Sequence, residues 1–363
     1  MTERPSTSSS QRNYGIDALR LFSMFSAVLL HILGSGGILR STSGAKLAIA
    51  WFLEISAYSC VNCFGIISGY TAYSDKERPH PFRKYLSLWI QVFFYSLGIV
   101  LLYNRIDSRA VSFNDIYTAL TPVSREYYWY FSAYTALFFI MPWLNMLMRA
   151  CTQRQANQLI AVLILIFSFC PILFKNEALF GLASGYSFVW LAVLYLIGAW
   201  MKKCAIPARI RCTRAFAFSM LCVLFTWIQK ICFNVHSFIS YISPTVLLHA
   251  ILLFILFSRA NIKGLFQKLI ICFSPAAFGV YLIHVHPFAW RILIENRYHH
   301  LAQSDTLLFP ILVLSCSFAL FIICLLVEKT RLILFHLFRI NIITDKFCDG
   351  VHALICKKQK QHP

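Results

Sequence analysis

The stretch that decides the fold runs from Ile16 to Leu33 and reads IDALRLFSMFSAVLLHIL. It is long and apolar enough to cross a bilayer, yet it carries Asp17, Arg20 and His31. An arginine at the centre of a spanning helix costs roughly 2.5–3.5 kcal/mol, so intramembrane charges usually face a protein interior and serve a function. Arg20 and His31 are eleven residues apart, which places them on one helix face about 16 Å apart along the axis. We expect one site to include all three side chains.

Composition indicates a polytopic membrane protein. Of its 363 residues, 59% are hydrophobic and 13% are charged, and the mean hydropathy is +0.66, a balance that excludes an ordinary soluble enzyme. A helix needs about 20 residues to cross a bilayer. We therefore predict an all-α fold of about ten transmembrane helices, over residues 16–33, 47–70, 86–103, 128–148, 158–174, 186–201, 215–233, 244–258, 269–288 and 307–328.

The basic residues are concentrated on one side of the predicted membrane domain. Of the 33 Lys and Arg residues, 23 fall on segments that share a side with the N-terminus and nine on the opposite side. Such a bias sets orientation, so both termini are expected in the cytoplasm. The net charge of +19 is then topological, a reason to expect contact with anionic lipid rather than nucleic acid. We divide the chain into a polar N-terminus (1–13), a membrane domain (14–330) and a basic cytoplasmic tail (331–363).

The thirteen cysteines do not indicate disulfides, because most lie within spans or on the reducing cytoplasmic side. Cys60 and Cys63 form a C-x-x-C without a matching pair elsewhere, so packing is the better interpretation. Cys348, His352 and Cys356 share a helical face in the tail, but three ligands without a fourth are a weak signal. We predict no metal site.

The predicted helix 47–70 carries a second intramembrane charge. Its polar and small residues recur along one face, at Glu54, Tyr58, Asn62, Gly65 and Gly69. Helix packing through small residues with polar contacts explains the glycines well and Glu54 poorly. Glu54 is therefore a candidate functional carboxylate in the outer half of the membrane.

His284 lies near the end of the predicted helix 269–288, at the same depth as His31 and Glu54. Imidazole is the usual general base near neutral pH, and a carboxylate can orient it. A lone histidine near a helix end is as often only an interfacial residue. The sequence does not say whether the three side chains meet.

The cytoplasmic boundary gathers residues of a different kind, namely Asp17, Arg20, Arg83, Lys84 and Glu328. Flanking Lys and Arg are mostly membrane anchors, but together they suit a phosphate-bearing donor, because arginine binds phosphate bidentately. The residues alone predict a basic mouth, with a centre made of a histidine base and a carboxylate about 16 Å further outward.

The same residues carry a family resemblance. The matching motifs are, in chain order, Ile16-Asp17-Ala18-Leu19-Arg20 with His31, Phe64-Gly65-Ile66-Ile67-Ser68-Gly69-Tyr70, Arg83-Lys84, Trp129-Tyr130-Phe131 leading to Pro142, Tyr281-Leu282-Ile283-His284, and Val327-Glu328-Lys329 with Arg331. With these the chain resembles the acyltransferase-3 family of bacterial integral-membrane O-acyltransferases, in the subgroup that acylates surface polysaccharides. The basic patch before residue 86 is thinner here than the R-R-x-x-R cluster of other members.

The resemblance implies transfer of an acyl group, most commonly acetyl, from cytoplasmic acyl-CoA to a hydroxyl of a lipid-linked or cell-surface carbohydrate, in a bacterial plasma membrane. Acyl-CoA is then a substrate, and no tightly bound cofactor is expected. Arg20 would position the donor and His31 would be the catalytic histidine, as a general base or as an acylated nucleophile. We add Glu54 as a carboxylate that orients the acceptor or stabilises the imidazolium.

The remaining site predictions fall into groups. Asp17, Ser68, Arg83 and Lys84 are expected to bind the donor with Arg20. The acceptor or the oxyanion is expected to contact Tyr281, His284 or Trp129. Glu328 is expected at the inner mouth or as a structural residue.

A transporter or flippase for a glycan or small anionic solute is the alternative function, since buried charges also mark proton relays. Against it, the sequence shows no inverted repeat and no paired helices broken by Gly or Pro. The choice between acetyl and succinyl, the glycan and the oligomeric state are left open.

Overall fold

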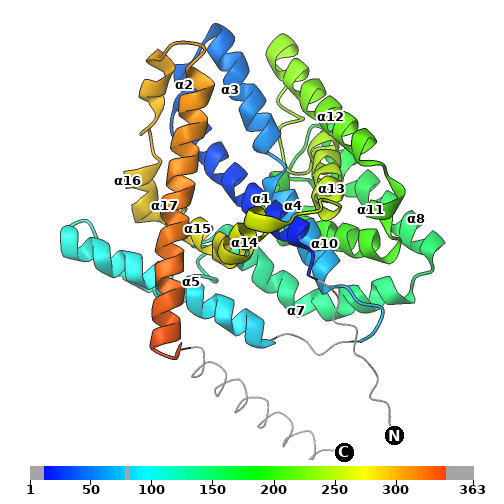
Figure 1. Ribbon diagram of the computed structural model, residues 1–363, viewed down its shortest axis with the longest axis horizontal. Helices are drawn as coiled ribbons and strands as arrows, with labels where there is room; N and C mark the ends of the chain where they lie inside the picture. The colour runs from blue at the N-terminus through cyan, green and yellow to red at the C-terminus, as the bar shows by residue number, and fades with distance from the viewer. Residues whose placement is uncertain (1–11, 78–81, 341–363) are drawn as a thin grey trace, which may run out of the picture.

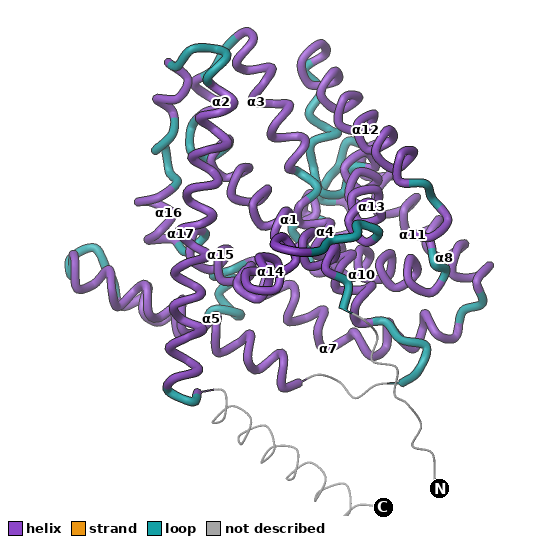
Figure 2. The backbone as a smooth tube through the Cα atoms, in the orientation of Figure 1, coloured by secondary structure: helices purple, strands orange, loops and turns teal. Residues whose placement is uncertain are grey.

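The computed structural model describes residues 12–77 and 82–340, and this part of the chain is helical, with no β-strand (Figures 1 and 2). The α-helices are α1 (Tyr14–Leu33), α2 (Ile38–Ser41), α3 (Gly44–Ala57), α4 (Cys60–Ala72), α5 (Phe82–Ile106), α6 (Phe113–Leu120), α7 (Trp129–Ala150), α8 (Gln153–Ile164), α9 (Cys170–Leu173), α10 (Phe188–Lys203), α11 (Ile206–Arg209), α12 (Cys212–Phe233), α13 (Pro244–Ser258), α14 (Gly264–Phe273), α15 (Ala277–His284), α16 (Pro287–Leu293) and α17 (Phe309–Leu337).

Helices occupy all ten stretches predicted from the sequence, so the all-α membrane fold is confirmed. In the described residues, eight helices or joined helix pairs are long and apolar enough to span a membrane. A ninth is counted if the turns over Leu179–Gly185 and α10, bent by 80°, form one span. The apolar helix α13, with 15 residues, is shorter than these and is the remaining candidate.

Helix α1 lies at the centre of the bundle (Figure 1) and contacts α3, α4, α13, α14, α15 and α17. Asn13 begins it, since its Oδ1 accepts from the backbone N–H groups of Gly15 and Ile16. A Cβ at Gly15 would lie only 1.8 Å from the Phe257 carbonyl oxygen, so only glycine permits this approach to α13. The charges on α1 therefore face protein rather than lipid.

The span predicted over residues 47–70 is present as one candidate crossing, Gly44–Ala72, but a turn at Tyr58 and Ser59 divides it into α3 and α4. Asn62, just after the break, donates to the Tyr241 carbonyl at 2.8 Å and accepts from Trp190 Nε1 at 3.0 Å. This asparagine therefore joins three segments of the bundle and does not serve the site directly.

Two glycine contacts join α4 to α10. A Cβ at Gly69 would lie 1.9 Å from the Tyr195 carbonyl oxygen, and one at Gly198 would lie 2.1 Å from that of Ile66. The two backbones thus approach as closely as small residues allow, the usual means of tight helix association in membranes.

The last helix is longer than predicted. The sequence indicated a span ending at Glu328 and a tail from residue 331, whereas α17 continues through this boundary to Leu337. The predicted N-terminal segment 1–13 falls almost wholly outside the described residues, and so do Cys348, His352 and Cys356.

Candidate active site

One cavity of about 510 Å³ has both Arg20 and His31 in its wall. Both residues lie on α1, and helix geometry separates them by about 16 Å along its axis. Between them the wall is apolar, with Met24, Ala27 and Leu30 of α1 among the lining residues. The cavity therefore has two polar ends connected by an apolar passage.

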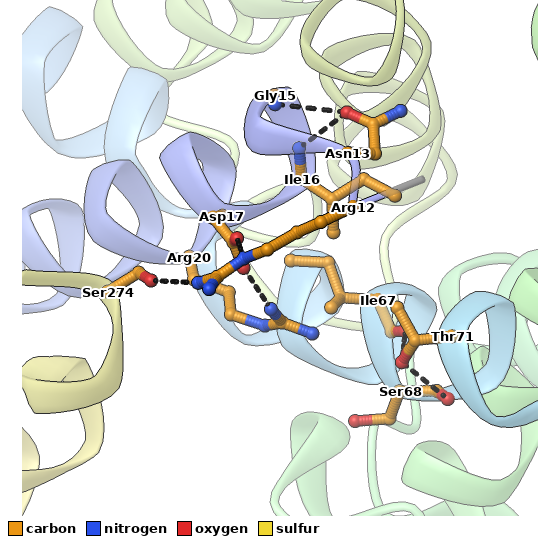
Figure 3. Close-up of polar contacts among 10 residues, drawn as sticks. All are labelled: Arg12, Asn13, Gly15, Ile16, Asp17, Arg20, Ile67, Ser68, Thr71 and Ser274. Atoms are coloured by element: carbon orange, nitrogen blue, oxygen red, sulfur yellow. Dashed lines mark hydrogen bonds and ion pairs between the residues drawn. The ribbon is translucent and has the colours of Figure 1, made fainter. Parts of the chain in front are cut away.

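A buried carboxylate organises the Arg20 end (Figure 3). Asp17 Oδ1 accepts from Arg20 at 2.5 Å, and its Oδ2 accepts from Arg12 Nε at 2.6 Å. Arg12 also donates to Ser274 Oγ at 3.1 Å, and Ser274 lines the cavity with Arg20. One carboxylate opposite two guanidinium groups leaves an excess positive charge, and such a setting favours phosphate.

Further residues of this end come from α4 and α5. Lys84 lines the cavity and adds a further cation to its wall. Figure 3 shows the Arg20 guanidinium extending toward the α4 segment that carries Ser68 and Thr71. Both hydroxyls donate to carbonyls of their own helix, Ser68 to Phe64 at 2.9 Å and Thr71 to Ile67 at 2.7 Å. Their protons are therefore used within α4, and they shape the wall.

The histidine end is a hydrogen-bonded pair. His31 Nδ1 lies 3.0 Å from His284 Nε2, and His284 Nδ1 lies 2.5 Å from the Val280 carbonyl oxygen. Because a carbonyl only accepts, a neutral His284 carries its proton on Nδ1 and accepts at Nε2. His31 then carries its proton on Nδ1, and its Nε2 is left with a free lone pair. This arrangement prepares His31 to take a proton or to attack a carbonyl carbon.

Two aromatic residues hold this pair in place. The Trp290 ring meets His31 edge-on, with centroids 4.9 Å apart. Tyr281, one turn before His284, lines the cavity, and its hydroxyl accepts from the Tyr130 backbone N–H at 3.4 Å. The Tyr281 proton is free to donate toward the cavity, so this hydroxyl is a candidate oxyanion donor.

Comparison with known proteins agrees with this geometry. A family model described as an acyltransferase domain matches residues 13–329, which contain both ends of the cavity. The chain belongs to this acyltransferase family. No curated protein and no solved structure matches the chain significantly.

The structure of this acyltransferase separates the predicted site residues. Arg20, Ser68 and Lys84 line one end of the cavity, and His31, Tyr281 and Trp129 line the other. Asp17 is buried behind Arg20 and positions it. His284 is buried behind His31, and Arg83 is not among the lining residues.

Glu54 is not brought to the histidines. It does not line the cavity, and among the described residues it makes no hydrogen bond with His31 or His284. Its carboxyl is buried, and its Oε2 has no hydrogen-bond partner in the described part of the chain. It lies close enough to interact electrostatically with Tyr58, Cys60 and Tyr186.

Glu328 makes structural contacts, which is one of the two roles expected for it. It is fully buried and accepts from Gln91 at 3.1 Å and Tyr95 at 2.7 Å on α5. It also forms a two-pronged ion pair with Arg331, at 2.5 and 2.9 Å, and it does not line the cavity. The Val327-Glu328-Lys329 segment with Arg331 therefore joins α17 to α5 through Glu328.

Sequence reasoning missed several residues of the site. Arg12 was assigned to the polar N-terminus, although it stands five positions before Asp17 on the approach to α1. Tyr186 and Tyr241 lie in loops, where spacing carries no signal of a shared wall. Trp290 follows the Y-L-I-H motif, and its aromatic side chain near His284 was an available indication.

Proposed function

We propose that this membrane acyltransferase moves an acyl group, acetyl by default, from acyl-CoA to a hydroxyl of a carbohydrate. The observation that carries the proposal is the two-ended cavity. A basic, carboxylate-organised end at Arg20 suits the phosphates of CoA, and an imidazole with a free ring nitrogen at His31 suits the transfer chemistry.

The donor spans the cavity in this proposal. The CoA phosphates bind at Arg12, Arg20 and Lys84 on the cytoplasmic side, which the distribution of basic residues favours. The uncharged pantetheine arm runs along the apolar passage beside Met24 and Leu30. The thioester then reaches His31, about 16 Å from Arg20 along α1.

The chemistry requires one base that becomes an acid. His31 Nε2 takes the proton from the acceptor hydroxyl, the hydroxyl oxygen attacks the thioester carbonyl carbon, and the carbon–sulfur bond breaks. His31 returns the proton to the CoA thiolate, so protons balance. In the alternative route the acyl group is transferred to His31 Nε2 before the acceptor attacks. Because His284 contacts Nδ1, the Nε2 atom of His31 is available in both routes.

We assign Tyr281 as the hydrogen-bond donor to the developing oxyanion. Arg20 is about 16 Å away along the helix, and both His284 nitrogens are already engaged. The Tyr281 hydroxyl remains as a cavity-lining donor.

The experiment is acyl transfer by the purified protein in nanodiscs, with radiolabelled acetyl-CoA and a crude glycolipid extract of the source cells. Wild type is expected to move label to glycolipid, and His31→Ala is expected to move none. Label on the protein without acceptor would select the acyl-histidine route. Absence of CoA binding by wild type would contradict the proposal and favour a transporter.

A further inference from the structure

Aromatic residues at the histidine end form a continuous row. Trp129 lies 4.7 Å from Tyr186 between ring centroids, and Tyr186 lies 5.1 Å from Tyr241. All three rings line the cavity. Behind them Tyr58 packs on Tyr241 at 5.0 Å. We call Trp129, Tyr186 and Tyr241 the ring wall.

Ring contacts place this wall at the histidine end. Trp129 contacts Tyr130 at 5.6 Å, Tyr130 contacts Tyr281 at 6.2 Å, and Tyr281 contacts His284 at 6.5 Å. His284 in turn is bonded to His31.

Two loops that fit closely carry Tyr186 and Tyr241, and Trp129 of the wall begins α7. Gly185 has φ +99°, and a Cβ there would lie 2.5 Å from Tyr241 Cβ, so only glycine lets Tyr186 and Tyr241 approach. The Ser184 carbonyl accepts from the Tyr241 backbone N–H at 3.2 Å. Ser184 itself adopts a left-handed conformation with φ 57°, a strained backbone of the kind that clusters at functional sites.

The central ring of the wall is accessible to a ligand. Tyr186 lines the cavity and is 48% exposed, so its ring is not fully covered by other side chains.

The chemistry of the rings indicates what binds. Tyrosine and tryptophan present an apolar face with a polar group at the edge, and they suit ligands that are apolar on one side and hydrogen-bonding on the other. A pyranose ring has this character, with C–H groups on its faces and hydroxyls at its rim. A simple alkyl chain would need no such polar edges.

We infer that the ring wall is the acceptor subsite and binds a pyranose ring, so that one of its hydroxyls faces His31. The inference rests on the proposed function, because it names where that reaction takes its acceptor.

The test compares acceptors that differ only in the sugar. The probes are p-nitrophenyl β-glycosides of glucose, galactose and N-acetylglucosamine, and the reference alcohol is 2-(4-nitrophenyl)ethanol. Tyr186→Ala is expected to raise the KM for an accepted glycoside at least tenfold, with the KM for acetyl-CoA changed less than twofold. Tyr186→Phe keeps the ring face and should recover most of the loss. Tyr117→Ala, at an exposed tyrosine of α6, is the matched control and should match wild type.

The outcomes separate the two proposals. A wild type that cleaves acetyl-CoA but acylates none of the glycosides overturns the subsite alone. An unchanged glycoside KM in Tyr186→Ala, or an equal rise for the reference alcohol, also overturns it. A wild type that does not cleave acetyl-CoA contradicts the proposed function, and the subsite fails with it.

Discussion

His284 makes two hydrogen bonds, one to His31 and one to the Val280 carbonyl. Together they keep the His31 proton on Nδ1. His284→Leu removes the acceptor and lets the His31 ring turn or change tautomer. General acid–base catalysis by a positioned side chain contributes about 10²–10⁴-fold, and a misoriented imidazole loses part of this. We expect kcat to fall by up to about that factor, with an unchanged KM for acetyl-CoA in steady-state kinetics.

A glutamine at this position supplies the control. Its side-chain oxygen accepts from His31 Nδ1–H, so His284→Gln should retain more activity than His284→Leu. Equal losses in the two variants, at matched thermal stability, would show that His284 only fills space.

The structure adds Arg12 beside the proposed donor end, where it donates to Asp17 and Ser274. Hydrogen bonds to charged groups contribute about 1.5–3 kcal/mol, or roughly 10- to 150-fold in affinity. Arg12→Met should raise the KM for acetyl-CoA within this range and leave kcat nearly unchanged. Arg109→Met, in an exposed loop far along the chain, should have no effect. A wild-type KM in Arg12→Met would remove Arg12 from the donor site.

Among single residues, the sequence predicted the relative positions of those that lie on α1. Arg20, His31 and Asp17 share a helix, so their spacing along the chain is enough to determine how they lie relative to one another. Arg12 precedes the helix and Tyr186 lies in a loop, where periodicity carries no information. Glu54 was expected at the depth of His31, but depth says nothing about the lateral position that the packing of α3 decides.

Among the helices, the contact of α4 with α10 depends on glycine. Gly198→Ala would place a Cβ 2.1 Å from the Ile66 carbonyl oxygen, and overpacking of this kind costs about 1–3 kcal/mol. We expect a lower melting temperature in detergent. Gly98→Ala on α5 is the matched control, because nothing lies within 4 Å of its Cβ. Alanine there should be neutral or stabilising by up to about 1 kcal/mol. Equal melting temperatures would contradict the close contact.

Glu328 and Arg331 form a buried ion pair within α17, and Glu328 also accepts hydrogen bonds from α5. Breaking a buried pair costs about 3–5 kcal/mol because it leaves an unpaired charge. Glu328→Leu should therefore lower the melting temperature strongly and leave the KM for acetyl-CoA unchanged. The double variant Glu328→Leu/Arg331→Leu should be more stable than the single one. A raised KM for acetyl-CoA in Glu328→Leu, at wild-type stability, would instead indicate that Glu328 contributes to donor binding at the inner mouth.

Hydropathy located the helices because apolar length is a local property of the chain. Breaks inside them were not predictable in the same way. The turn at Tyr58 and Ser59 has no proline or glycine, and the bend before α10 depends on contacts with the loop that carries Tyr241. The length of α17 was underestimated because Glu328 was taken as a boundary charge, whereas its partner Arg331 lies one turn later on the same helix.

Across the whole molecule, α13 decides the number of crossings. At 15 residues it is about 22 Å long, shorter than the ~30 Å hydrocarbon core, yet the positive-inside bias needs it to cross. In a cysteine-free background, an impermeant maleimide should label Ser237→Cys, before α13, in intact cells. It should label Asn261→Cys, after α13, only once the cells are opened. Labelling of both from outside would mean that α13 does not cross and that the two termini lie on opposite sides.

The most direct measurement combines CoA binding and single-turnover acyl transfer on the same nanodisc preparations of wild type, Arg20→Met and His31→Ala. If binding and chemistry occupy opposite ends of one cavity, His31→Ala binds CoA as tightly as wild type and transfers no label. Arg20→Met then loses CoA affinity. Substantial transfer by His31→Ala, or undiminished CoA affinity in Arg20→Met, would contradict this division of the site.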